Sequence, residues 1–75
     1  MSGGPDSVND LQVINAPWNK EVTIGEATYE GGFKMLRIRI KEGKSRFTDL
    51  ELDAETATKL GTAMADWLKA NAPGG

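Results

Sequence analysis

The sequence predicts an α+β protein in which three or four antiparallel strands precede one C-terminal helix. Apolar and polar residues alternate through most of residues 34–53, which is typical of strands with one buried face. Over residues 54–71 the apolar residues instead recur every three or four positions, as on one face of a helix. The chain has 75 residues, the size of one small domain. We therefore expect a two-layer fold, with the sheet packed against the helix.

The strands are expected at about residues 11–14, 20–29, 34–41 and 46–53. Residues 34–41 give the clearest alternation, since Leu36, Ile38 and Ile40 share one side. After Gly25 the apolar phase shifts by one residue, which predicts a β-bulge at that glycine.

The helix is expected at about residues 54–71, with Asp53 as its N-cap and Pro73 just beyond its end. Its apolar residues form one stripe, and we expect Leu60 and Trp67 in this stripe to lie in the core. The members of the stripe are Ala57, Leu60, Met64, Trp67 and Leu68.

The two ends of the chain are expected to lie outside the folded domain, which spans residues 11–72. Residues 1–10 contain Gly3, Gly4 and Pro5 and predict a disordered tail, and residues 73–75 predict a flexible C-terminus. A terminal Gly-Gly pair is also found in ubiquitin-like modifiers and sulfur carriers. In those proteins a strand precedes the pair, whereas here a helix does, so we do not favour that function.

The composition excludes several kinds of catalytic and metal site. The chain has no cysteine and no histidine, so it has no thiolate zinc site, no Ser-His-Asp triad and no imidazole base. The alternate acids of Asp49-x-Glu51-x-Asp53-x-Glu55 lack the glycine and final glutamate of a calcium loop, and we interpret them as a strand face and a helix cap. We expect a protein that is not an enzyme and has no cofactor, metal or membrane span. The absence of cysteine favours a cytoplasmic location.

A basic segment is the candidate nucleic-acid face. Cations beside aromatic rings on an open sheet are suited to single-stranded nucleic acid, because charge follows the phosphates and rings stack on the bases. The residues of this candidate face are Lys34, Arg37, Arg39, Lys41, Lys44, Arg46 and Phe47. A hairpin that places Arg39 opposite Asp49 and Arg37 opposite Glu51 would neutralise this face instead, and we favour that interpretation.

Three aromatic residues outside the clearest strands, Trp18, Tyr29 and Phe33, form a candidate partner surface. For Trp18, which follows Pro17, packing on the core is the alternative that we favour. A domain this small buries a limited fraction of its surface, and apolar area left uncovered would be available to a partner. Our first expectation is a non-enzymatic protein-interaction module, homodimeric, with an unidentified partner.

The layout also resembles that of the PC4-type transcriptional coactivators. The resemblance covers residues 20–70, and its nearest local part is the strand 34–41 leading through Phe47-Thr48-Asp49-Leu50-Glu51-Leu52 into the helix. It implies a small homodimer that binds single-stranded DNA on a basic, aromatic-bearing sheet. The chain departs from that pattern in its acidic strand and its net charge of −2. Single-stranded nucleic-acid binding is therefore the alternative function.

Overall fold

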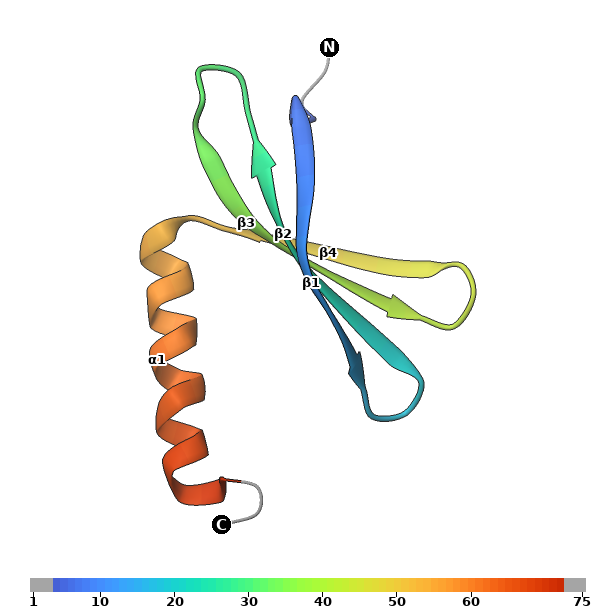
Figure 1. The fold of residues 1–75 in the computed structure, drawn as a ribbon, viewed down its shortest axis with the longest axis vertical. Coiled ribbons are helices and arrows are strands. Elements are labelled where there is room, and N and C mark those ends of the chain that lie inside the picture. The colour runs from blue at the N-terminus through green and yellow to red at the C-terminus, as the bar shows by residue number, and fades with distance from the viewer. Residues whose placement is uncertain (1–3, 73–75) are drawn as a thin grey trace.

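The computed structural model describes residues 4–72 and consists of one four-stranded antiparallel sheet followed by one helix (Figure 1). The sheet order is β1-β2-β3-β4, so each strand pairs with the next one in sequence. The elements are β1 (Ser7–Ala16), β2 (Lys20–Thr28), β3 (Lys34–Glu42), β4 (Arg46–Leu52) and α1 (Ala54–Asn71). The predicted α+β class is confirmed. The C-terminal segment 73–75, with its Gly-Gly pair, lies outside the described residues.

Strand β1 is longer than the sequence predicted. It begins at Ser7, where Ser7 pairs with Thr28, and it continues to Ala16 opposite Lys20. The prediction of a disordered tail is therefore wrong for residues 7–10, which form strand pairs with β2. This segment has little apolar alternation of its own, and the open hydrogen-bonding edge of β2 orders it instead.

The register shift predicted at Gly25 lies in the neighbouring strand. β2 pairs with β3 without interruption across Gly25, whereas the β1–β2 register shifts between Asp10 and Gln12. Gly25 faces this shift, and a Cβ atom on it would lie 3.1 Å from the Asn9 carbonyl oxygen. The glycine thus permits the close approach of β1, and the extra residue of the bulge, Leu11, belongs to β1.

The pairing separates the sheet into two chemically distinct faces. Residues that lie opposite one another in an antiparallel pair share a face, and Ile38 lies between Ile24 and Leu50. We call this side the apolar face. Its apolar members are Ile14, Val22, Ile24, Leu36, Ile38, Ile40, Leu50 and Leu52. Ion pairs lie at its two ends, Lys20–Glu42 and Glu26–Lys34.

Helix α1 is joined to β4 by one residue, Asp53, and leaves the sheet instead of lying across it (Figure 1). The Asp53 carboxylate accepts a hydrogen bond of 2.8 Å from the Thr56 amide, so the predicted cap is confirmed. The helix has no buried residue and contacts only β3 and β4. The prediction that the apolar stripe packs on the sheet of the same chain is therefore wrong. Trp67, expected in the core, is 63% exposed, and Leu60 is also exposed.

The extended helix gives the chain an open shape. Its radius of gyration is 14.4 Å, whereas a compact domain of this length has about 11 Å. Ala27 and Leu52 are the buried apolar side chains among residues 4–72, and no large side chain there is fully enclosed. Over the same residues, no helix is long and apolar enough to cross a membrane. The apolar face and the helix stripe are thus two separate, uncovered apolar surfaces.

Candidate functional site

The side of the sheet opposite the apolar face carries most of the charged groups that the strands bring together. We call it the polar face. Here Arg37 lies between Gly25 and Glu51, and Arg39 lies between Thr23 and Asp49. The face borders a groove of about 220 Å³, lined by Val8, Asp10, Glu21, Thr23, Gly25, Arg37, Arg39, Lys41 and Phe47. All four strands contribute to this groove.

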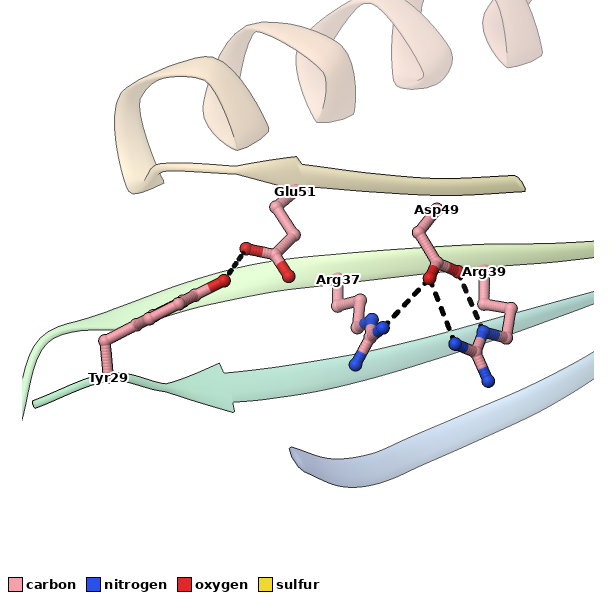
Figure 2. Close-up of polar contacts among 5 residues, drawn as sticks. All are labelled: Tyr29, Arg37, Arg39, Asp49 and Glu51. Carbon is pink, nitrogen blue, oxygen red and sulfur yellow. Dashed lines mark hydrogen bonds and ion pairs between the residues drawn. The ribbon is translucent and has the colours of Figure 1, made fainter. Parts of the chain in front are cut away.

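Asp49 is the centre of the polar face (Figure 2). Its carboxylate accepts two hydrogen bonds from Arg39, at 2.8 and 3.0 Å, and one of 2.9 Å from Arg37. These hydrogen bonds, from Arg39 and then Arg37, hold the pKa of the Asp49 carboxyl far below its usual value. The same contact raises the pKa of Arg39. The single carboxylate of Asp49 therefore binds two guanidinium groups.

Tyr29 and Glu51 form a second polar contact beside Asp49. The Tyr29 hydroxyl donates to the Glu51 carboxylate, and this hydrogen bond raises the pKa of Tyr29 (Figure 2). The strand register predicted for Arg37 opposite Glu51 is confirmed, but the expected ion pair between them is wrong. Glu51 accepts from Tyr29, whereas Arg37 reaches diagonally to Asp49. Its Nε atom is buried without a hydrogen-bond partner.

The candidate nucleic-acid residues do not form one surface. Arg37, Arg39, Lys41 and Phe47 share the polar face, and the Arg39 guanidinium lies 5.2 Å from the centre of the Phe47 ring. Lys34 belongs to the other side of the sheet, where it pairs with Glu26 at 3.6 Å. Arg46 also alternates to that side, and Lys44 lies in the turn between β3 and β4. The favoured expectation of a neutralised sheet face agrees with this geometry.

The candidate partner residues are also divided. Tyr29 and Phe33 meet in the β2–β3 connection, with ring centres 5.2 Å apart. Trp18 lies in the β1–β2 hairpin, at the other end of the antiparallel sheet. Packing on the core, favoured for Trp18 from the sequence, is wrong because the side chain is 86% exposed. Its backbone φ of 61° lies in the left-handed region, which bulky residues rarely adopt.

The acids at alternate positions have separate structural roles. Asp49 binds the two arginines, Glu51 accepts from Tyr29, and Asp53 caps the helix. Glu55 pairs with Lys59 along the helix, at 3.8 Å. The interpretation of this series as a strand face and a helix cap is therefore confirmed.

Uncovered apolar area was expected from the small size of the domain, but its place on the helix stripe and on the apolar face was missed. On α1, Ala63, Met64, Trp67 and Leu68 line an apolar groove of about 330 Å³. On the apolar face, a second groove of about 230 Å³ includes Leu11, Leu36 and Leu52. The signal was the single residue, Asp53, between the last strand and the helix, because so short a connection limits how the helix can turn back.

We expect Asp49→Asn to lower the free energy of unfolding by about 1 kcal/mol at pH 7, because two guanidinium groups lose their anionic partner. The folded-state pKa of Asp49 is lowered, so its stabilisation is complete above the unfolded pKa near 3.9 and is lost as the pH falls below it. Urea unfolding at pH 7 and pH 3 checks this. The difference in the free energy of unfolding between the wild type and Asp49→Asn should be smaller at pH 3 than at pH 7.

Asp66→Asn is the matched control, because Asp66 forms an exposed pair with Lys69 on the helix surface. We expect it to change the stability little at either pH. An Asp49→Asn protein as stable as the wild type at pH 7 would contradict the role given to Asp49.

Comparison with known proteins relates the chain to a family model. No match to the chain was found among curated proteins or among solved structures. One family model, described as a family of unknown function (DUF6967), matches residues 5–70, which include all four strands and nearly the whole helix. The chain therefore belongs to the family of unknown function DUF6967.

Proposed function

We propose that this chain is a small, non-enzymatic protein-interaction module that works as a homodimer. The observation that carries the proposal is the exposure of large apolar side chains on both the sheet and the helix. Leu50 is 50% exposed and Met64 is 59% exposed. Isolated exposed apolar residues are ordinary, but contiguous apolar surfaces on two elements are typical of binding sites.

The energetics of so small a chain support a permanent partner. Burial of apolar surface has to offset the conformational entropy lost on folding. Among the described residues the buried apolar side chains are those of Ala27 and Leu52, which amount to a very small core. A partner that covers the apolar surfaces would supply the missing burial and would stabilise the fold by mass action.

The polar face supports binding of a further protein once the apolar surfaces are covered. It combines arginines, acids and the half-exposed ring of Phe47 around a shallow groove, and arginine and aromatic residues are enriched in protein interfaces. Trp18 offers a second anchor at a hairpin tip, because it is exposed and held in a strained backbone conformation.

Analytical ultracentrifugation tests the homodimer. We expect the wild type to sediment at twice the chain mass of 8.1 kDa. Met64→Glu should weaken association by about 3 kcal/mol, on the order of 100-fold in the dissociation constant, because a charge would enter an apolar interface. Thr62→Glu, on the polar side of the helix, is the control and should leave the dimer intact. A folded wild-type protein that sediments as one chain at high concentration would overturn the proposal.

A PC4-like single-stranded nucleic-acid-binding protein is the second candidate function. The contact between Arg39 and Phe47, with Lys41 next to them, favours it. The double contact of Asp49 with Arg37 and Arg39 favours the first proposal, since it neutralises charge that a phosphate would need.

Fluorescence anisotropy with a labelled single-stranded oligonucleotide separates the two functions. We expect no saturable binding by the wild type at physiological salt. The second function would instead give saturable binding that Arg37→Gln/Arg39→Gln abolishes and Lys59→Gln, on the helix, preserves. In that case each contacting cation would contribute roughly 0.7 to the slope of log affinity against log salt.

A further inference from the structure

We propose that the two copies of the chain exchange helices, so that α1 of each copy lies on the apolar face of its partner's sheet. This inference rests on the proposed homodimer and specifies which surfaces meet. The surfaces involved are the apolar stripe of α1, centred on Met64, and the apolar face, centred on Ile24 and Ile38.

The connection between sheet and helix argues against packing within one chain. Asp53 is the single residue between the end of β4 at Leu52 and the start of α1 at Ala54. Its side chain is fixed by the hydrogen bond to the Thr56 amide, which defines the first turn of the helix. A connection of one residue leaves little length of chain for α1 to turn back over its own sheet, and short hinge connections favour exchange between copies.

The amount of exposed surface fits one further copy. The chain exposes 5861 Å², whereas a compact monomer of 8.1 kDa exposes about 4,500 Å². The excess, about 1,400 Å², is more than the ~800 Å² that each partner contributes to a protein interface of standard size. A second copy that covers the helix and the sheet would therefore lower the exposed area of each chain to that of a compact protein of this mass.

The helix and the sheet also match in size and chemistry. A helix of 18 residues is about 27 Å long, and strands of nine residues extend about 30 Å. The apolar face has ion pairs at both of its ends, Lys20–Glu42 and Glu26–Lys34. It thus has the apolar centre and polar rim that are typical of a protein interface.

Exchange covers both apolar surfaces in one symmetric arrangement. Packing of sheet on sheet would leave the stripe of each helix exposed, and packing of helix on helix would leave each apolar face exposed. When each helix lies on the other copy's sheet, the same pair of surfaces meets twice about a two-fold axis. Such a contact is closed, so it stops at two copies.

Cysteine cross-linking tests the exchange directly, because the natural chain contains no cysteine. Met64→Cys and Ile24→Cys are prepared as separate proteins with tags of different size, mixed, and treated with a short bismaleimide. We expect a cross-linked pair that contains one copy of each. Residues that meet in an interface have an effective concentration in the millimolar range, so the yield at micromolar protein should exceed that of a control mixture by on the order of 100-fold.

The control mixture carries Thr62→Cys and Thr23→Cys, which place the thiols on the polar sides of the helix and the sheet. A second mixture, Leu68→Cys with Leu50→Cys, keeps the test valid if either first variant unfolds. Circular dichroism and sedimentation of each variant establish that it is folded and dimeric before cross-linking.

Each alternative arrangement gives its own result. Cross-linking of Met64→Cys with itself indicates helix on helix, and that of Ile24→Cys with itself indicates sheet on sheet. In a chain that carries both Met64→Cys and Ile24→Cys, a cross-link within that one chain indicates a helix folded back on its own sheet. Any of these, or a dimer with no mixed cross-link, overturns the exchange and leaves the homodimer standing. A wild-type protein that sediments as one chain overturns both the homodimer and the exchange of helices.

Discussion

The covalent connection between β4 and α1 constrains the rest of the structure. A single capping residue, Asp53, joins them, so the helix leaves the sheet at the point where the last strand ends. The amphipathic helix and the amphipathic sheet form as their sequence patterns require, but their apolar sides do not meet within one chain. One chain can therefore form its strands and its helix without burying their apolar sides against each other. In the arrangement that we propose, a second copy covers these apolar sides and completes the core.

The polar face depends on a different constraint, the number of carboxylates within reach of two arginines. Asp49 binds both, whereas the neighbouring Glu51 accepts from the Tyr29 hydroxyl. The guanidinium charges are thus offset locally, and the Phe47 ring beside Arg39 lies next to a charge that is already paired. This distribution of charge suits contact with another protein, whose surface carries both signs, better than contact with a continuous row of phosphates.

Local patterns predicted the elements, and contacts between distant segments decided the rest. The alternation at Leu36, Ile38 and Ile40, together with that of the following strand, predicted β3 and its register with β4. Residues 7–10 were assigned to a tail because their strand character comes from pairing with β2. The pairing of Arg37 with Asp49 could not be predicted from the register, because the register places Glu51, and not Asp49, opposite Arg37. The exposure of Trp67 depends on the direction in which the helix leaves β4, which periodicity does not describe.

In the arrangement that we propose, the folded chain owes its stability to a second copy, and the concentration dependence of thermal unfolding tests this most directly. Unfolding can be followed by circular dichroism over a 100-fold range of protein concentration, without any substitution or label. Association that stabilises the folded state makes the midpoint temperature of unfolding depend on protein concentration. We expect the midpoint to rise steadily with concentration. A cooperative transition whose midpoint is the same at every concentration would show that one chain is stable alone, and would contradict the claim.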